Sequence, residues 1–394
     1  MRTSSFLALC AAVFAAAFGY TAVMPLLPEL LSPLMPQASP LGLAWHAGGY
    51  AAIYMVAVVV FSPAWGAASD RYGAKAVIAT GLAGSAVAFL ASSFADGLWS
   101  AYAGRTVQGA FASAILPVAT AALAKIPDTE ERARKVAGLG AASLLGFFAA
   151  PALSASAVSV LAGDAVAMVL SASGLVALAA LAIVVVMLSR APHRSGEAAV
   201  KEERPLPWRF LALNLLAYLG LGAFEVALPL AARGPLALDA AQVSLLFAEC
   251  SLVMLAAQGA LMWGARYRAR FEQALIASIA VYAAGLLLLA GAGSMGRATA
   301  AVGLIAASSG LVLPLVAYLA TLEIGARPGA ALGALTGAGA LGQAVGSASG
   351  GALYGYAGSA VFTATAFAVA LGTWLASRAC APRWLGGGSR CTRS

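Results

Sequence analysis

The sequence is poor in charged residues. Only 10% of its 394 residues are Asp, Glu, Lys or Arg, whereas 62% are hydrophobic. A soluble domain carries about 25% charged residues. The composition therefore excludes a soluble globular core of this length and indicates a protein that crosses a membrane many times.

Cysteine and histidine are also scarce. The four cysteines are scattered at Cys10, Cys250, Cys380 and Cys391, and neither they nor the two histidines have the spacing of a metal site. We expect no disulfide framework, no metal and no cofactor. The apolar runs contain no cluster of His, Asp and Glu and no catalytic cysteine arrangement, so a membrane-embedded enzyme lacks support.

A phosphate-binding loop is missing as well. The glycine-rich stretch near residue 340 is not followed by Lys-Ser/Thr, so it does not cradle a nucleotide. Its spacing, Gly342-x3-Gly346-x3-Gly350, is typical of a helix face that packs closely against another helix. Any energy-requiring process is therefore expected to draw on a gradient rather than on a bound nucleotide.

Twelve apolar stretches are each long enough to cross about 30 Å of hydrocarbon as a helix. Helices are required because no water is present there to satisfy open backbone groups. Arg2 and the apolar run after it are similar to a signal peptide, but the run continues to Pro28, so we expect a first span. The expected spans are approximately 6–28, 46–66, 76–94, 99–124, 136–160, 165–189, 209–231, 240–262, 272–292, 298–322, 330–352 and 357–377.

Basic residues are distributed unevenly between the loops. With twelve spans both termini lie on one side, and 20 of the 23 Lys and Arg residues fall on that side. Arg233 and Arg297 lie on the opposite side, and Arg105 lies within a span. The positive-inside rule predicts that both termini are cytoplasmic in a bacterial-type inner membrane. Because the positive charge is confined to loops, the net charge of +8 does not indicate nucleic-acid binding.

The longest polar stretch, residues 190–208, lies in the middle of the chain. Its prolines and mixed charges predict a flexible cytoplasmic linker. On either side we expect a six-helix bundle, residues 1–189 and residues 209–379, with a disordered cytoplasmic tail over residues 380–394. One chain holding both bundles is sufficient as a monomer.

Short matches recur about half a chain apart. Residues Ala64–Ala67 recur as Met262–Ala265, and residues Ile115–Val118 recur as Val312–Leu315. Matches in the same order argue for duplicated halves, an arrangement in which substrate sites lie between the repeats.

A short charged loop is expected at Trp65–Lys75, between the second and third spans. It is similar to the loop pattern Gly-x-x-x-Asp-Arg-x-Gly-Arg-(Arg/Lys) of the major facilitator superfamily, although Ala74 departs from the pattern. The resemblance implies two six-helix bundles that alternate access to a central cavity, with this loop as a gate. The matching residues are Gly66, Asp70, Arg71, Gly73 and Lys75.

Three further stretches resemble the same superfamily. Gly19, Pro25 and Pro28 resemble the Gly-x5-Pro-x2-Pro ending common among drug:proton antiporters, and Arg105–Gly109 resembles Arg-x-x-Gln-Gly. In the fifth span, Ala150-Pro151 stands where the antiporter motif has Gly-Pro followed by paired glycines. The sequence is thus similar to the twelve-span drug:proton antiporter branch that includes tetracycline and multidrug efflux.

Three charged residues are expected inside the membrane: Arg105, Glu225 and Glu249. Counting from the nearest loop places them about 9, 12 and 15 Å deep, all in the outer half. An ionisable side chain in hydrocarbon is costly, so it normally faces a cavity and has a partner. The resemblance implies that spans 1, 4, 7 and 10 line the central cavity, which Arg105 and Glu225 would then face.

A carboxyl that alternates between an apolar environment and one near an arginine can bind and release a proton. We therefore expect Glu225 to be the leading proton carrier, Glu249 the second, and Arg105 the charge that modulates them. The alternatives are a packing role for Arg105, snorkelling of Glu225 towards Arg233, and a coupling-independent hydrogen bond for Glu249. Candidate cavity residues are Gln108, Tyr20, Pro25, Tyr218 and Tyr318, although interhelical hydrogen bonding is an alternative for Gln108 and is expected for Gln343.

The sequence is best interpreted as an all-α, twelve-span, proton-coupled secondary transporter in the lipid bilayer that exports a small amphiphilic compound. An uptake symporter or a uniporter on the same fold is the first alternative. If the protein were a scaffold or a sensor, the unfavourable free energy of burying charged side chains in the membrane would have no functional explanation.

Overall fold

The computed structural model describes residues 2–124, 126, 128–161, 164–189, 206–234, 236–263, 271–323 and 328–384. In the first part of the chain the helices are α1 (Thr3–Thr21), η1 (Met24–Leu26, a 3-10 helix), α2 (Leu27–Leu31), α3 (Pro40–Tyr72), α4 (Ala74–Ser92), α5 (Leu98–Ala112), α6 (Leu116–Ala124), α7 (Thr129–Leu161) and α8 (Ala165–Met187). In the second part they are α9 (Trp208–Ala232), α10 (Ala240–Trp263), α11 (Phe271–Ala290), α12 (Met295–Glu323), α13 (Pro328–Ala357) and α14 (Ala360–Trp384). The predicted all-α fold class is confirmed.

Among the described residues, ten helical segments are long and apolar enough to cross a membrane. They correspond to the first ten predicted spans, with α1, η1 and α2 forming the first and α5 and α6 the fourth. The eleventh, α13, has 30 residues and is not among these ten segments. In α14 the apolar part is shorter, Ala360–Ala376.

Prolines divide two of the predicted spans. Pro25 and Pro28 lie where α1 gives way to η1 and α2. Pro117 follows a turn over residues 113–115 that separates α5 from α6. A proline has no N–H to donate and its ring clashes with the preceding turn, so the helix is interrupted there. The predicted spans over 6–28 and 99–124 each still form one membrane-crossing segment, within which the helix is interrupted.

The expected loop at Trp65–Lys75 is mostly helical. Helix α3 continues to Tyr72 and α4 begins at Ala74, so Gly73 is the only residue between them. Gly73 has φ of 85°, a conformation that is accessible to glycine at little cost. One such residue is enough to reverse the chain, which is why the charged motif remains in the last turns of α3.

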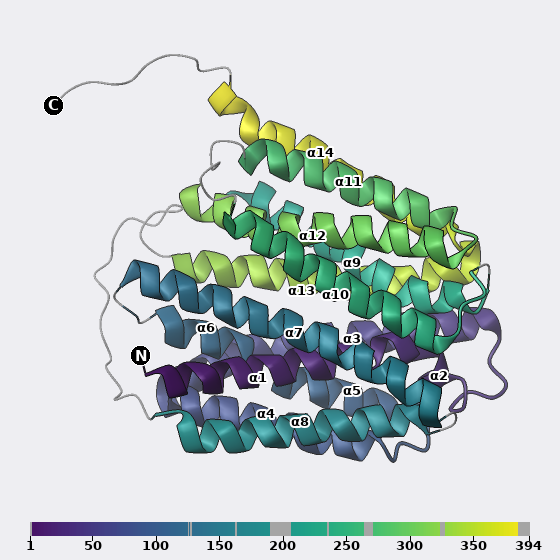
Figure 1. Ribbon diagram of the computed structural model, residues 1–394, viewed down its shortest axis with the longest axis horizontal. Coiled ribbons are helices and arrows are strands. Elements are labelled where there is room, and N and C mark those ends of the chain that lie inside the picture. Colours follow the sequence, from purple (N-terminus) through teal and green to yellow (C-terminus); the bar gives the residue numbers. More distant parts are fainter. Residues whose placement is uncertain are drawn as a thin grey trace.

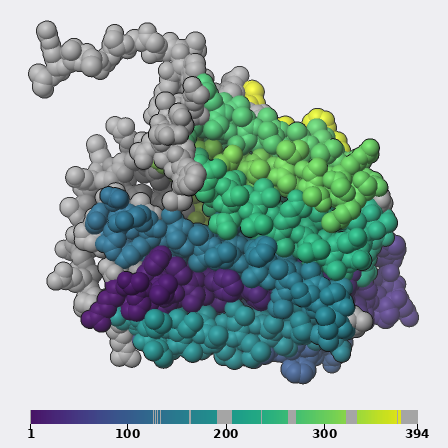
Figure 2. Space-filling view, in the orientation of Figure 1, coloured from purple at the N-terminus to yellow at the C-terminus, as the bar shows by residue number. Residues whose placement is uncertain are grey.

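The long helices run roughly parallel to one another (Figure 1). Helices α1, α4 and α8 lie on one side and α9 to α14 on the other, and α1 begins at the same end of the molecule where α14 ends. The space-filling view shows α7 and α10 meeting where the two sets adjoin (Figure 2). Helix α13 also packs along α3. We call the opposite end of the molecule, where α2 lies, the α2 end.

Two predicted segments fall partly outside the described residues. Of the linker expected at 190–208, the structure describes residues 206–208. Of the tail expected at 380–394, it describes the part up to Trp384, which continues α14.

Candidate functional site

A buried cluster of polar side chains lies between the two parts of the chain. The Tyr20 hydroxyl, near the end of α1, donates a hydrogen bond of 2.6 Å to Glu225 Oε2 in the second half of α9. Gln343 Nε2 of α13 donates to the same carboxylate oxygen at 3.0 Å and contacts the Tyr20 hydroxyl oxygen at 2.8 Å. Three helices therefore meet at one carboxyl group.

The glycines of α13 hold Gln343 in position. A Cβ added at Gly342 or Gly346 would lie 2.2 or 2.1 Å from the backbone carbonyl oxygen of Leu215 or Leu219 in α9. The backbones of α9 and α13 can approach this closely only because these residues have no side chain. The predicted close-packing role of this glycine face is confirmed, and it fixes Gln343 and Glu225 relative to each other.

Arg105 of α5 is fully buried. Its guanidinium lies over the rings of Tyr54, Tyr20 and Tyr50, with Cζ 4.4, 5.5 and 5.5 Å from the ring centroids. It also donates to Gln108 Oε1 and to the Tyr20 carbonyl oxygen, both at 3.2 Å, whereas Nε has no partner among the described atoms. The tyrosine faces partly replace the water that the cation has lost.

Tyr20 lies between the two buried charges. Its carbonyl accepts from Arg105 and its hydroxyl donates to Glu225. Within the described residues no ion pair joins Arg105 directly to Glu225. The structure thus brings these two predicted residues together through a tyrosine, so that the charge on one changes the electrostatic environment of the other.

Glu249 lies elsewhere. It is half-buried on α10, and a Cβ added at Gly303 of α12 would lie 3.5 Å from its Oε1. No hydrogen bond or ion pair described in the structure joins Glu249 to Arg105 or Glu225. Similar depth in neighbouring spans therefore did not mean a shared site.

The remaining candidate cavity residues are dispersed. Gln108 is fully buried and donates to Ser92 of α4 at 3.0 Å, so its predicted interhelical hydrogen bond is confirmed. Pro25 is buried in η1. Tyr218 lies against α13, where a Cβ added at Gly339 would be 2.8 Å from its ring, and Tyr318 packs edge-on against Phe271 at 5.4 Å.

The charged motif lies at the end of the molecule opposite the α2 end. Lys75 Nζ donates to the Val185 carbonyl oxygen of α8 at 2.7 Å, and the Arg71 guanidinium lies 5.2 Å from the Tyr72 ring centroid. Asp70 is exposed. A Cβ added at Gly66 would meet nothing within 4 Å, so packing in this conformation does not require glycine there.

The α2 end is closed by contacts between the two parts of the chain. A Cβ added at Gly351 of α13 would lie 2.4 Å from the carbonyl oxygen of Ala44 in α3. Arg233, which follows α9, donates to Glu29 Oε1 at 3.1 Å and to Ser32 Oγ at 2.7 Å. These contacts leave no room between α3 and α13 at this end.

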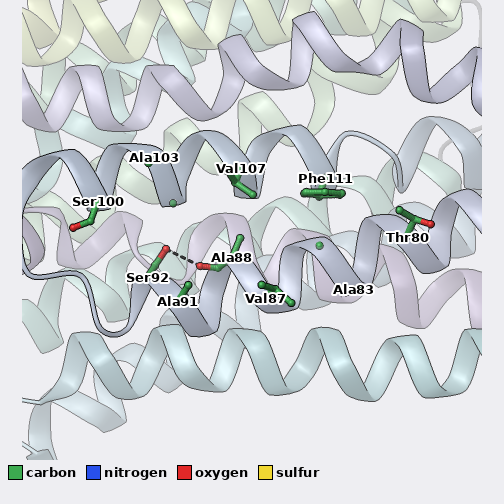
Figure 3. A pocket seen from close by; sticks show the side chains of 12 residues that line it. Thr80, Ala83, Val87, Ala88, Ala91, Ser92, Ser100, Ala103, Val107 and Phe111 are labelled. Carbon is green, nitrogen blue, oxygen red and sulfur yellow. Dashed lines mark hydrogen bonds between the residues drawn. The ribbon is translucent and has the colours of Figure 1, made fainter.

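An apolar groove of about 660 Å³ lies between α4 and α5 (Figure 3). Its walls are formed mostly by alanine, glycine and valine residues. Ser92, which also lines it, donates a hydrogen bond to the Ala88 carbonyl oxygen. Ser92 is also the acceptor of the Gln108 hydrogen bond. The groove belongs to the first part of the chain and does not include Glu225.

Three residues of the cluster were not assigned to the site from the sequence. Tyr50 and Tyr54 lie on α3 and face Arg105, and Gln343 was expected only to join helices. The spacing of four residues between the two tyrosines puts them on one helix face, which was an available signal. Nothing local to α13 indicates that Gln343 meets a glutamate 118 residues earlier.

A polytopic helical fold with a buried arginine and a buried glutamate near the junction of its two parts is typical of a multi-pass membrane transporter. The sequence pattern of the Major Facilitator Superfamily matches residues 9–213, and the chain belongs to this superfamily. The tetracycline resistance protein, class G, of Vibrio anguillarum is 34% identical over 223 residues, which is 57% of this chain and 54% of that protein. The match thus spans about half the length of that relative.

Two solved structures share the fold. The crystal structure of the human organic anion transporter MFSD10 (TETRAN) has a TM-score of 0.72 at 20% identity and covers 95% of this chain and 100% of its own. The crystal structure of a D-xylose-proton symporter has a TM-score of 0.76 at 14% identity and covers 94% and 96%. At these identities the similarity concerns the fold alone.

Proposed function

We propose that this protein is a proton-coupled exporter of a small amphiphilic compound across a bacterial inner membrane. Glu225 is the proton-binding residue. The observation that carries the proposal is the position of Glu225, buried between α1, α9 and α13 and bonded to Tyr20 and Gln343. A buried ionisable residue in a membrane span normally serves the transport pathway.

The comparisons support the class of substrate. A relative that is 34% identical over 57% of this chain bears the name of a tetracycline resistance protein. The direction of transport rests on that similarity and on the antiporter-like motifs of the first half. The two six-helix bundles, residues 1–189 and 209–379, would rock about the Glu225 region, and a monomer is sufficient for this motion.

The orientation follows from the loops. The distribution of basic residues supports a cytoplasmic position for the chain termini and for the motif with Asp70, Arg71 and Lys75. The α2 end then faces outward, and the conformation described here is closed to the outside. In this scheme the motif acts as a cytoplasmic gate, with Gly66 and Gly73 allowing α3 and α4 to shift.

Arg105 modulates the site and Glu249 is the second candidate for proton binding. Arg105 acts through Tyr20, which contacts both charges. Glu249 is the weaker candidate because it is half-buried on α10 and no hydrogen bond described in the structure joins it to Glu225 or Arg105. Substrate contacts from Gln108, Pro25, Tyr218 and Tyr318 remain part of the proposal.

An uptake symporter or a uniporter is the alternative. The fold is shared with a D-xylose-proton symporter, so the architecture itself accommodates transport in either direction. A symporter would use Glu225 for accumulation, whereas a uniporter would be insensitive to its charge.

The test uses energised everted membrane vesicles that contain the full chain and a pH-sensitive dye. A panel of amphiphilic compounds, tetracycline among them, is added to wild type, Glu225→Gln and Glu249→Gln. Substrate-evoked proton release in wild type and in Glu249→Gln, lost in Glu225→Gln, is the expected result. Asp96→Asn, an acid-to-amide change near the start of α5, is the matched control and retains proton release.

Substrate exchange across unenergised vesicles separates coupling from binding. Glu225→Gln should still exchange labelled substrate, because the amide preserves the shape of the carboxyl. Proton release that persists in Glu225→Gln contradicts the assignment of the proton to this residue. Absence of proton movement together with uptake in intact cells would replace the exporter by an importer.

A further inference from the structure

The Tyr20–Glu225–Gln343 cluster joins elements that must separate during transport. Tyr20 lies in α1, whereas Glu225 and Gln343 lie in α9 and α13, which are fixed to each other by the glycine face of α13. Opening of the α2 end moves the first part of the chain away from the second. The 2.6 Å hydrogen bond from Tyr20 to Glu225 lies across that boundary and cannot survive such a movement.

We propose that Tyr20, supported by Gln343, is a latch that keeps the α2 end closed while Glu225 is ionised and no substrate is bound. The inference rests on the proposed function, because it needs Glu225 to bind the transported proton. It makes Tyr20 and Gln343 positioning residues for coupling, in addition to any contact with substrate.

The strength of the latch depends on the charge of Glu225. A hydrogen bond to a carboxylate is roughly twice as strong as one to a neutral acceptor. Ionised Glu225 accepts from both Tyr20 and Gln343 at one oxygen. When Glu225 takes up a proton it loses its charge, the Tyr20 bond across the boundary weakens, and the α2 end opens more readily.

This dependence gives exchange of proton for substrate. With the α2 end closed, the Glu225 carboxyl loses its proton to the cytoplasm and the carboxylate accepts the Tyr20 hydroxyl. The empty, ionised protein is then held closed, so it cannot open outward and carry a second proton in without cargo. A substrate that donates a hydrogen bond to Glu225 displaces Tyr20 and releases the latch, and the outward-open site then exchanges substrate for a proton.

Among the described residues, Arg105 is the cationic side chain that acts on Glu225. Arg105 stays with the first part of the chain through its bonds to Gln108 and Tyr20. Its positive charge attracts ionised Glu225 across the boundary and acts in the same direction as the latch. The remaining titratable groups that interact with Glu225 are Tyr20, Tyr218, Cys250 and Tyr282.

Closure of the α2 end can be measured by cross-linking. Trp45 of α3 and Tyr356 of α13 are exposed there, and their ring centroids lie 6.2 Å apart. A chain with Trp45→Cys and Tyr356→Cys is treated in membrane vesicles with a short thiol-reactive cross-linker over a range of pH, beside a chain without the new pair. In the otherwise wild-type chain, the yield should be high at neutral pH and fall as the pH is lowered, and it should fall more steeply than in Tyr20→Phe, which shares the slower reaction of thiols at low pH.

Tyr20→Phe removes the donor and keeps the ring and the backbone carbonyl that Arg105 contacts. At neutral pH, the ratio of molecules with the α2 end closed to those with it open should fall roughly tenfold or more. This change corresponds to the loss of one hydrogen bond to a charged group. An imposed pH gradient should also collapse faster without substrate. Gln343→Leu should change both readouts in the same direction by less, because the Tyr20 bond remains.

Tyr102→Phe is the matched control. Its hydroxyl donates to the His46 carbonyl oxygen at 3.0 Å, a bond between α5 and α3 that does not cross the boundary. The cross-linking yield and the rate of proton leak, measured as collapse of the pH gradient without substrate, should stay at wild-type values in this variant.

The outcomes separate the latch from the proposed function. If Glu225→Gln loses proton coupling while Tyr20→Phe keeps wild-type cross-linking and leak, the latch is wrong and Glu225 remains the proton site. If Tyr20→Phe stops transport but leaves cross-linking unchanged, the hydroxyl serves substrate binding and the latch is again wrong. If Glu225→Gln keeps substrate-evoked proton release, the proposed function fails first.

Discussion

The two buried charges of this protein are held in different ways. Arg105 is enclosed by α5, α1 and α3, all within the first part of the chain, and its partners are tyrosine rings, a glutamine and a carbonyl oxygen. Glu225 receives one of its two hydrogen bonds from the other part of the chain. Arg105 is therefore held within the first part of the chain, whereas the contacts of Glu225 join the first part to the second.

Replacing Arg105 by leucine should have the largest effect on stability. The change removes three cation–π contacts and leaves Gln108 Oε1 and the Tyr20 carbonyl oxygen without their donor. We expect the free energy of unfolding to fall by roughly 2–4 kcal/mol. Thermal unfolding of the detergent-solubilised protein measures it. A melting temperature within about one degree of wild type would contradict this expectation, because Arg105 would then not contribute to the stability of the fold.

Gly351→Ala tests the boundary itself. The new Cβ would lie 2.4 Å from the Ala44 carbonyl oxygen, and only separation of α3 and α13 relieves the clash. We expect a cost of about 1–3 kcal/mol to the closed conformation. Cross-linking between positions 45 and 356 should fall and transport should slow.

The control for Gly351→Ala is Gly140→Ala in α7, where a Cβ meets nothing within 4 Å. Equal cross-linking yields in the two variants would show that α3 and α13 can separate there without cost to closure.

Glu225→Gln should change stability much less than Arg105→Leu. The amide oxygen still accepts from Tyr20 and Gln343, so we expect the unfolding free energy to change by less than about 1 kcal/mol. Proton coupling should nevertheless be lost. A drop in melting temperature as large as that of Arg105→Leu would mean that Glu225 is a structural residue, and the contrast between the two charges would disappear.

The smallest effect is expected at the exposed link between the two parts. Glu29 and Arg233 form an ion pair at 3.1 Å, with side chains 31% and 42% exposed. Such pairs contribute about 0–1 kcal/mol and are screened by salt. Glu29→Gln should therefore reduce cross-linking at the α2 end slightly, and only at low ionic strength. An effect as large as that of Tyr20→Phe would move the latch from Glu225 to this pair.

Several features of the fold follow from local sequence patterns. Runs of about 20 apolar residues predict most of the helices, because hydrocarbon leaves no other way to satisfy the backbone. The spacing of Gly342, Gly346 and Gly350 predicts a close helix contact. The motif at Trp65–Lys75 was expected to be a loop, since charge between apolar runs is typical of loops, but one glycine at positive φ was sufficient for the turn.

The candidate site depended on contacts between distant residues. Counting along each span placed Arg105, Glu225 and Glu249 at similar depth, yet depth says nothing about which way a side chain faces. Tyr20 and Gln343 are 323 residues apart in the sequence, yet Gln343 Nε2 lies 2.8 Å from the Tyr20 hydroxyl oxygen in the structure. No local pattern carries that information, because it arises from the packing of η1 against α9 and of α3 against α13.

The sequence by itself determined that this is a polytopic helical membrane protein, where most of its helices lie, and that it carries costly charges within the membrane. Those properties depend on the composition of each segment, and hydrophobicity acts on each segment separately. The tertiary structure decided that Arg105 belongs to one bundle, that Glu225 lies at the boundary, and that Tyr20 joins them. Those properties depend on how helices far apart in the chain pack against one another, and a single helix does not specify its neighbours.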